Sequence, residues 1–324
     1  MKKNIAIIMG GYSSEYKISL ISGGVVYDFL DKEKFNAYRI HIFKDKWVYV
    51  DHNQNEFNVN RHDFTVSLDS EILKFDCVFN AIHGTPGEDG LMQAYLQLIG
   101  IPQTSCDYYQ AALTFNKRDL LSVLKPYGIK SAPSYYMNLG DPINEDAIIE
   151  KVGLPCFVKA NKAGSSFGIS KVYKKEELLK AIENAFKEDN EILIESFLNG
   201  TEVSVGVIKY KGETKVLPIT EIVSENDFFD YEAKYEGKSQ EITPARITKD
   251  QEKKVTEIAK KAYEVLKMKG FSRSEFIFVD GEPFMLEMNT TPGLTTESIL
   301  PQQAKIAGIP LSELFESAIW EALG

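Results

Sequence analysis

The sequence has few cysteines and no long apolar run. Its three cysteines, Cys77, Cys106 and Cys156, are far apart and odd in number, which argues against a disulfide framework or a zinc site and favours a reducing, cytoplasmic compartment. No apolar stretch approaches the roughly 18 residues of a membrane span, and the short apolar run after Lys2-Lys3 does not reach the length of a signal-peptide core. We therefore expect neither a signal peptide nor a membrane partner.

Clusters of basic residues are also lacking, and the formal net charge is −10. Because binding to a phosphate backbone requires a basic surface, a nucleic-acid partner is not expected. The sequence contains no repeats and no low-complexity segments. With 44% hydrophobic and 26% charged residues in 324, it has the composition of a folded globular protein with two or three domains.

The first hundred residues show the pattern of a doubly wound parallel sheet. An apolar strand at 4–9 ends in a glycine-rich polar loop that contains Glu15, and a strand at 75–82 ends in a second glycine-rich loop that begins with His83. Ligand groups of such sheets lie at the carboxyl ends of strands, so we expect the two loops to face each other across a cleft. A solvated glutamate and a structural histidine are the alternatives for these two residues.

The middle of the chain carries two lysines and a loop of small residues. Lys117 begins this part, and a strand at 154–160 carries Lys159. The loop at 161–168 contains Ser165 and Ser166, and small residues allow backbone N–H groups to approach phosphate oxygens. The loop does not match the Walker pattern, because it has no Gly-Lys-Ser/Thr at the required spacing and a strand follows it. A plain hairpin turn is the alternative.

Two alternating runs near the C-terminal end predict a hairpin with a metal site. The first run carries Arg273 and Glu275, and the second carries Glu287 and Asn289. Residues two apart on a strand share a face, and carboxylate and amide oxygens suit Mg²⁺ or Mn²⁺ rather than zinc. The alternative is a surface hairpin with solvated acids. Upstream, the polar and aromatic segment 225–240 is too long for an ordinary connection and is interpreted as a mobile lid.

The register of this hairpin decides whether the metal site can form. A two-residue turn at 280–281 is the stronger local signal, but it pairs Glu275 with Leu286 and turns Glu287 to the other face. A shared face requires a bulge or an odd-numbered loop. We predict a three-residue loop, 280–282, which pairs Glu275 with Glu287.

The order of the motifs resembles the D-alanine:D-alanine ligase family of the ATP-grasp superfamily over nearly the whole chain. Two departures are present: Glu275 and Asn116 stand where the family usually has aspartate. The motifs that carry the resemblance are Gly10-Gly11-Tyr12-Ser13-Ser14-Glu15, His83-Gly84, Gly87-Glu88-Asp89-Gly90, Asn116-Lys117, Val158-Lys159, Gly164-Ser165-Ser166-Phe167-Gly168, Tyr231-Glu232-Ala233-Lys234-Tyr235, Glu287-Met288-Asn289, Pro292-Gly293 and Ser298.

The resemblance implies a three-domain α/β fold. A substrate-binding domain would span residues 1–105, and ATP would lie between a central ATP-grasp subdomain, 106–197, and a C-terminal one, 198–324, which carries the lid. It also implies a cytoplasmic homodimer that associates through the first domain.

The resemblance further implies a reaction in which ATP activates one D-alanine as an acyl phosphate, which the amine of a second D-alanine then attacks. The alternatives are another acceptor, D-serine or D-lactate, and a nucleotide-binding protein without ligase activity. The resemblance associates use of D-lactate with loss of the lid tyrosine, and Tyr235 is present.

The residue roles follow the same resemblance. Two Mg²⁺ ions, or Mn²⁺ in their place, are expected on Glu275, Glu287 and Asn289. ATP is expected on Lys117, Lys159, Ser166, Glu195, Phe197, Leu198 and Glu202. Catalysis and substrate binding are expected of Glu15, Ser165, Tyr235, Arg273, Gly293 and Ser298, with His83 and Lys234 as further substrate contacts.

Overall fold

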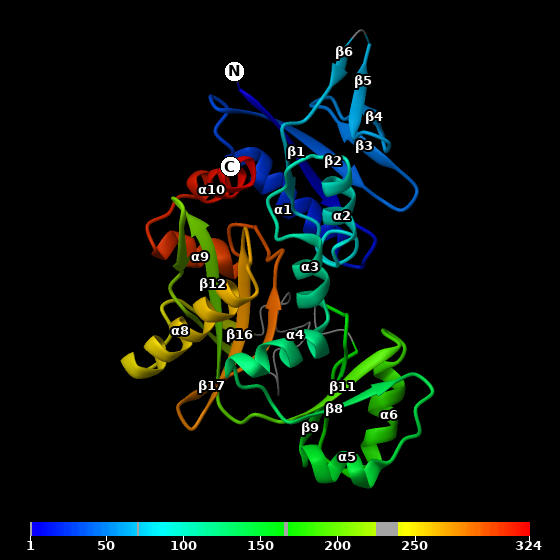
Figure 1. Ribbon diagram of the computed structural model, residues 1–324, viewed down its shortest axis with the longest axis vertical. Coiled ribbons are helices and arrows are strands. Elements are labelled where there is room, and N and C mark those ends of the chain that lie inside the picture. The colour runs from blue at the N-terminus through cyan, green and yellow to red at the C-terminus, as the bar shows by residue number, and fades with distance from the viewer. Residues whose placement is uncertain (1, 70, 165–167, 225–238) are drawn as a thin grey trace.

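The computed structural model describes residues 2–69, 71–164, 168–224 and 239–324. Within these residues the strands form three sheets, stacked along the long axis of the molecule (Figure 1). In the part of the chain that is described, no helix combines the length and the apolar character needed to cross a bilayer. The lid segment proposed at 225–240 falls almost entirely outside the described residues, as do Ser165 and Ser166.

The first sheet joins a parallel part to an antiparallel extension, in the order β6-β5-β4-β3-β2-β1-β7. Its parallel strands are β1 (Lys3–Gly10), β2 (Phe35–Ile42) and β7 (Cys77–Asn80). The extension consists of β3 (Trp47–Val50), β4 (Glu56–Asn60), β5 (Thr65–Leu68) and β6 (Glu71–Leu73). The helices that accompany this sheet in the chain are α1 (Tyr16–Phe29) and α2 (Leu91–Leu98). The predicted α/β class is confirmed, although parallel pairing is limited to three strands.

Pairing of β1 with β7 brings together the two glycine-rich loops that follow these strands. The amide of Tyr12 donates to the carbonyl of Thr85 over 2.8 Å, and the Ser13 hydroxyl donates to the carbonyl of His83 over 3.0 Å. The loops therefore lie side by side, as the carboxyl ends of neighbouring parallel strands must.

The second sheet is a small antiparallel one that forms the lower lobe in Figure 1. Its order is β10 (Ser170–Val172), β9 (Cys156–Ala160), β11 (Glu191–Ser196) and β8 (Ser134–Asn138), with α5 (Glu145–Val152) and α6 (Lys175–Ala185). Along β9, Cys156, Val158 and Ala160 are buried while Phe157 and Lys159 alternate with them. Because Cys156 and Val158 pack with α5 and α6, Lys159 points to the opposite face.

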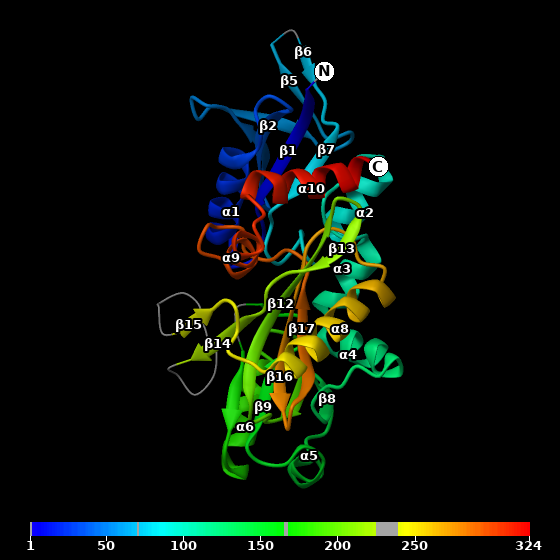
Figure 2. The ribbon, with the colours of Figure 1, turned by 90° about the vertical axis from the view of Figure 1, so that its left-hand side faces the viewer.

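The third sheet has the path β15-β14-β12-β16-β17, with β13 paired to β12. Its strands are β12 (Thr201–Tyr210), β13 (Glu213–Val216), β14 (Thr220–Ser224), β15 (Ser239–Ile242), β16 (Ser272–Val279) and β17 (Glu282–Asn289). Helix α8 (Lys249–Val265) packs along this sheet, as Figure 2 shows. The chain ends with α9 (Ile299–Ile306) and α10 (Leu311–Leu323).

Helices on either side of the predicted domain boundaries pack across them. The side chains of α3 (Tyr108–Phe115) and α4 (Lys117–Leu124), the latter followed by the 3-10 turn η1 (Lys125–Tyr127), share a core with the third sheet. Helix α10 packs against the first sheet through Phe315 and Ile319. The predicted domain boundaries at 105 and 197 stay a prediction, because these helices pack against sheets other than those that chain order would assign to their domains.

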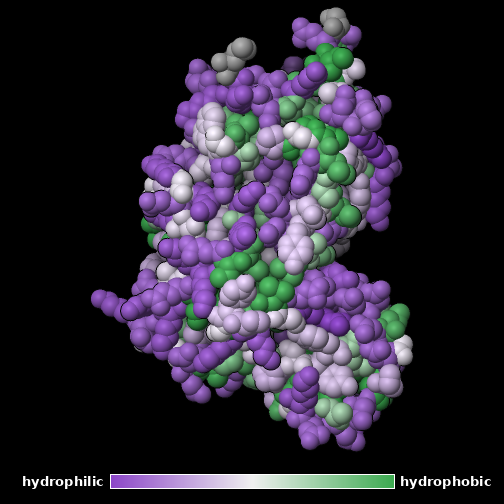
Figure 3. Space-filling view, in the orientation of Figure 1, coloured by the Kyte–Doolittle hydropathy of each residue, from purple (hydrophilic) through white to green (hydrophobic). Residues whose placement is uncertain are grey.

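Figure 3 shows a mostly hydrophilic face with hydrophobic residues gathered near its middle. A notch separates the lower lobe, which holds the second sheet, from the body above it.

The hairpin of β16 and β17 has the predicted pairing of Glu275 with Glu287, but a different turn. Val279 pairs with Glu282 around a two-residue turn whose φ angles, 50° and 76°, are both positive, as a type I′ turn requires. The predicted three-residue loop is therefore wrong. A bulge at Leu286 of β17, opposite the step from Glu275 to Phe276 on β16, restores the shared face.

The bulge also explains which side chains of β17 are buried. Met285 and Met288, three residues apart, are 0% and 3% exposed and both belong to the core beneath the sheet. Strict alternation would have placed Met285 on the face of Glu287. The extra residue, Leu286, lets the strand change faces while its hydrogen bonding continues on either side.

Candidate active site

The face of the hairpin that turns away from the core presents four polar side chains. Arg273 pairs with Asn289 across the two strands, and Glu275 pairs with Glu287. The Arg273 guanidinium forms an ion pair with Glu275 and donates to the Ser204 hydroxyl over 3.1 Å. Burial alone would lower the pKa of Arg273, but the Glu275 carboxylate, with a smaller effect from Glu287, raises it. Arg273 is thus a fixed cation next to two carboxylates.

Two lysines approach these carboxylates from the central part of the chain. The Lys117 ammonium lies 3.2 Å from a Glu287 oxygen and donates to the carbonyl of Ala163 over 2.9 Å. Lys159 lies 2.9 Å from a carboxylate oxygen of Glu195, whose residue is 3% exposed. Burial favours a lower pKa for Lys159, but the nearby Glu195 carboxylate raises it, so this lysine is held as a cation.

Glu15 brings the first sheet into the same place. It stands at the start of α1, immediately after the first glycine-rich loop. A Cβ placed on Gly164 would lie 3.0 Å from a carboxylate oxygen of Glu15, so the small-residue loop approaches this carboxylate closely. One pocket is lined by residues from all three parts of the chain, among them Glu15, His83, Glu88, Lys117, Gly164, Arg273, Glu287 and Asn289.

His83 lines this pocket with both ring nitrogens engaged. Its Nδ1 is 2.8 Å from the carbonyl of Thr291, and its Nε2 is 3.0 Å from the Ser22 hydroxyl. Because a carbonyl can only accept, Nδ1 carries the proton and Nε2 accepts from Ser22. Burial lowers the pKa of His83, in keeping with a neutral ring. This arrangement ties the loop after β17 to α1, and a role in substrate binding stays a prediction.

The segment after β17 places Gly293 beside Ser298. Ser298 is the residue at which α9 begins, and its hydroxyl is 2.8 Å from that of Thr295. A Cβ on Gly293 would come within 2.7 Å of the Ser298 hydroxyl, so only glycine fits there without a shift. The predicted helix start at Ser298 is confirmed, and its N-terminal amides offer a place for an anion.

An aromatic and basic cluster follows β11 on the Lys159 side of the second sheet. The rings of Phe157 and Phe197 are 6.1 Å apart, and the Lys171 ammonium lies 4.0 Å from the centre of the Phe197 ring. Glu202 lies at the start of β12, beyond Leu198. An apolar aromatic surface next to cations suits a purine and its phosphates.

Four of the predicted site residues, Ser165, Ser166, Lys234 and Tyr235, lie outside the described residues.

Glu88 is a pocket residue that the sequence reasoning missed. Its carboxylate accepts from the amide of Gly84 over 2.9 Å and lines the pocket with Glu15. Burial, with a further effect from the Glu15 carboxylate, raises the pKa of Glu88 to about 8. The only signal in the sequence was its position in the second acidic loop.

Replacing Glu88 by glutamine should flatten the pH dependence of stability in the ligand-free protein. The native pKa of about 8 exceeds the ordinary 4.5, so native Glu88 keeps a proton that the unfolded chain has lost. Stability therefore falls as pH rises from about 5 to 8, by an amount on the order of a few kcal/mol. Urea unfolding between these pH values measures the slope. Identical slopes for Glu88→Gln and the wild type would contradict the expectation.

Family models for the two parts of one enzyme match the chain. The model described as D-ala D-ala ligase N-terminus covers residues 4–106, and that described as D-ala D-ala ligase C-terminus covers residues 123–320. A D-alanine--D-alanine ligase of Flavobacterium johnsoniae is 77% identical over 98% of this chain and 98% of its own length.

Solved structures show the same likeness. The D-Ala:D-Ser ligase VanG of Enterococcus faecalis superposes with a TM-score of 0.86 at 33% identity, over 99% of this chain and all of its own. A D-alanine--D-alanine ligase from Bacillus anthracis complexed with ATP gives a TM-score of 0.80 at 27% identity, over 99% and 97% of the two chains.

Three sheets that converge on a cleft of lysines and carboxylates define a ligase of the ATP-grasp class. Within that class, the chain belongs to the D-alanine–D-alanine ligase family.

Proposed function

We propose that this protein joins two D-alanine molecules into D-alanyl-D-alanine at the expense of ATP, as a step in building peptidoglycan precursors. The observation that carries this is the single pocket to which Glu15, Lys117, Arg273 and Glu287 come from separate parts of the chain. Activation and joining of two amino acids require three kinds of group: lysines that bind an anion, a carboxylate that binds an ammonium group, and a fixed guanidinium.

ATP would lie between the second and third sheets. Lys117 and Lys159 would neutralise its phosphates, the apolar surface of Phe197 and Leu198 would hold the adenine with Glu195, and Glu202 would take the ribose. This is supported by the buried ion pair of Lys159 and by the aromatic surface beside it. Ser166 would add a hydroxyl to the phosphate loop.

Two Mg²⁺ ions, or Mn²⁺ in their place, would be held by Glu275, Glu287 and Asn289. Among the described residues, no group of three or more His, Cys, Asp or Glu side chains is placed to hold a metal alone. Two carboxylates and an amide on one face nevertheless fit magnesium, which takes few protein ligands and completes its shell with phosphate oxygens and water. Bound there, the ions would withdraw charge from the phosphoryl oxygens.

In the first step, the carboxylate of the first D-alanine attacks the γ-phosphorus and ADP leaves, which gives an acyl phosphate. Glu15 holds the ammonium of that D-alanine, and Ser165 and Tyr235 would hydrogen-bond to Glu15. In the second step, the amine of the other D-alanine attacks the acyl carbon and phosphate leaves. Arg273 and the amide of Gly293 stabilise the oxyanion between these events.

The second D-alanine would be bound through its carboxylate by Ser298 at the start of α9, with Lys234 in support. His83 would contact a substrate only if one of its present partners gave way. We extend the proposal to a cytoplasmic homodimer that associates through the first domain.

Phosphate release from ATP tests the function. D-alanine alone should drive release at neutral pH and yield the dipeptide, whereas L-alanine should not. D-serine and D-lactate, each with D-alanine, test the acceptor, and D-serine is included because VanG is a D-Ala:D-Ser ligase. Equal turnover with L-alanine, or ATP binding without any D-alanine-dependent release, would rule out the proposed ligase.

A further inference from the structure

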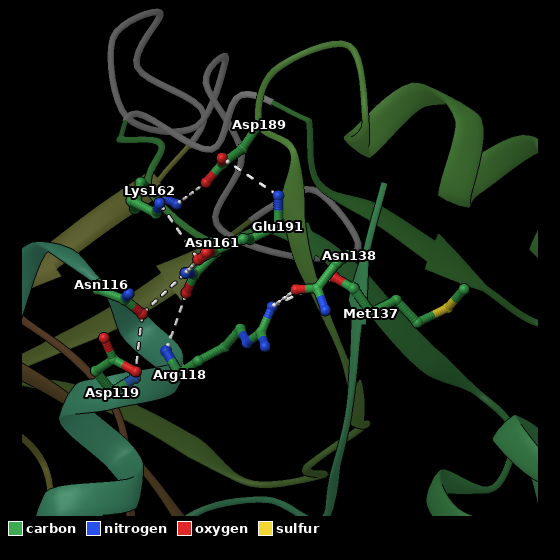
Figure 4. Close-up of polar contacts among 9 residues, drawn as sticks. All are labelled: Asn116, Arg118, Asp119, Met137, Asn138, Asn161, Lys162, Asp189 and Glu191. Atoms are coloured by element: carbon green, nitrogen blue, oxygen red, sulfur yellow. Dashed lines mark hydrogen bonds and ion pairs between the residues drawn. The ribbon is translucent and has the colours of Figure 1, made fainter. Parts of the chain in front are cut away.

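A polar cluster next to Lys117 joins four segments of the chain. It contains the first turn of α4, the end of β8, the start of the loop after β9, and the start of β11 (Figure 4). Asn161 lies at its centre, between Asn116 on one side and Glu191 on the other. The cluster lies outside the pocket described above, and Asn161 is 0% exposed.

The side chain of Asn161 makes three hydrogen bonds. Its Nδ2 donates to Asn116 Oδ1 over 2.8 Å and to Glu191 Oε2 over 2.8 Å, while its Oδ1 accepts from the amide of Arg118 over 3.0 Å. Its own amide donates to the carbonyl of Glu191 over 3.0 Å. The residue is therefore fully committed on both its backbone and its side chain.

These partners fix which end of the amide faces which neighbour. A backbone N–H can only donate, so Oδ1 must face Arg118, and an ionised carboxylate can only accept, so Nδ2 must face Glu191. Burial would raise the pKa of Glu191, but the hydrogen bond from Asn161 and the Lys162 ammonium hold it below its ordinary value. Position 161 thus needs one acceptor and one two-fold donor, which among side chains of this size only asparagine supplies.

Asn116 has different requirements, although it is the same residue type only 2.8 Å away. Its Oδ1 accepts from the side chain of Asn161 and also from the amide of Asp119. The second of these bonds makes Asn116 the N-terminal cap of α4. Both of these bonds use the oxygen of Asn116. An aspartate could accept both, and its charge would be favoured at the helix start.

The cluster bears on Lys117 because Lys117 is held at two points by the same loop. Its amide donates to the carbonyl of Asn161 over 3.5 Å, and its ammonium donates to the carbonyl of Ala163 over 2.9 Å. The same ammonium lies 3.2 Å from Glu287 on the third sheet. A shift of Asn161 would therefore move the loop, Lys117, or both, relative to Glu287.

We propose that Asn161 is a positioning residue, which sets the ammonium of Lys117 and the start of the small-residue loop against the carboxylates of the third sheet. The inference rests on the proposed function only in taking the ligand of Lys117 to be the phosphates of ATP. Because Asn161 is fully buried, it would contact neither ATP nor D-alanine and would act through Lys117 and the loop.

The two asparagines provide a matched test. Asn161→Asp turns an acceptor toward both Glu191 and Asn116, so it should raise the Kd for ATP by roughly 10- to 100-fold through displacement of Lys117. Asn116→Asp makes the same change on the asparagine that contacts Asn161. It should leave the Kd for ATP within about 3-fold of the wild-type value, because it removes only a side-chain donor that the cluster does not use. Titration calorimetry with ATP and with AMP, in the absence of D-alanine, measures both.

AMP separates positioning from general damage. Because AMP lacks the outer phosphates, Asn161→Asp should change its Kd little, whereas a locally unfolded loop would lose both nucleotides. Adding Glu191→Gln should partly restore ATP affinity, since the glutamine amide can donate to the new aspartate; the recovery is partial because Lys162 pairs with the same Glu191 oxygen, at 3.3 Å, that the amide nitrogen replaces. Glu191→Gln alone should be tolerated.

Equal losses for the two Asn→Asp variants, or equal losses of ATP and AMP, would overturn the inference. Failure of the Glu191→Gln rescue with normal thermal stability would overturn it as well. These results are independent of turnover: a wild-type protein that binds ATP but releases no phosphate with D-alanine would refute the ligase and leave the binding comparison intact.

Discussion

Replacement of Lys159 by methionine should destabilise the ligand-free protein by about 3 to 5 kcal/mol, because it leaves a buried carboxylate without its counter-ion. Glu195, which is 3% exposed, lies 2.9 Å from the Lys159 ammonium, and its remaining hydrogen bond, from the Ser134 hydroxyl, is long at 3.4 Å. Urea unfolding followed by circular dichroism measures the loss. ATP-dependent turnover should disappear at the same time.

The double variant Lys159→Met with Glu195→Gln separates the two effects. Glutamine is neutral, so it should recover most of the lost stability, whereas turnover should not return without the lysine. A single Lys159→Met variant as stable as the wild type would show that water reaches Glu195. A double variant with normal turnover would remove Lys159 from the phosphate site.

Glu287→Gln should raise the Mg²⁺ concentration for half-maximal turnover by at least about 100-fold, since even residues that only support metal ligands cost 10- to 100-fold in affinity. The change removes a charged oxygen from the proposed metal site. It also removes the carboxylate that lies 3.2 Å from the Lys117 ammonium. Phosphate release across a Mg²⁺ titration measures it.

Glu282→Gln is the matched control, because it makes the same change on the same strand. Glu282 lies at the far end of β17, where it pairs with Lys130 and Lys254 near the surface. Exposed pairs of this kind contribute little, so its Mg²⁺ dependence should match that of the wild type. If the two variants titrated alike, Glu287 would not be a metal ligand.

The hairpin shows how far local patterns predict this fold. The alternation over both strands and the turn at Asp280 and Gly281 are readable from a few neighbouring residues, and the positive φ angles of that turn are what its sequence favours. The bulge at Leu286 cannot be predicted from neighbouring residues in this way. It arises because Met285 and Met288 must both reach the core beneath the sheet while Glu287 faces the cleft, which is a demand of the whole packed sheet.

The site divides in the same manner. The loops with Glu15 and His83 were predictable as neighbours, because parallel strands place their carboxyl ends together. Glu88 was missed because its raised pKa depends on burial in the folded chain and, to a smaller extent, on Glu15, which is distant in sequence. Asn161 was missed because its partners, Asn116 and Glu191, come from segments that meet only in the folded chain.

Helices α3 and α4 show why the domain organisation was harder to predict than the elements. Their helical periodicity is local, but whether their apolar faces cover the second or the third sheet depends on chain direction after residue 105. They pack with the third sheet, through Leu120 and Leu121 among others. Composition on the two sides of that point gives no indication of this choice.

The bulge in β17 also constrains how genes of this type can vary. Loss of the single codon for Leu286 would keep the reading frame, the turn and the length of the loop. It would remove the bulge, but Met285 would stay opposite Phe276 and Glu287 opposite Glu275, so regular alternation would keep Met288 in the core and Glu287 and Asn289 on the cleft face. The strand thus carries one residue more than its two faces require. We therefore expect a single-residue deletion in β17 to be tolerated at Leu286 and not between Glu287 and Asn289, where it would move a cleft side chain to the core face.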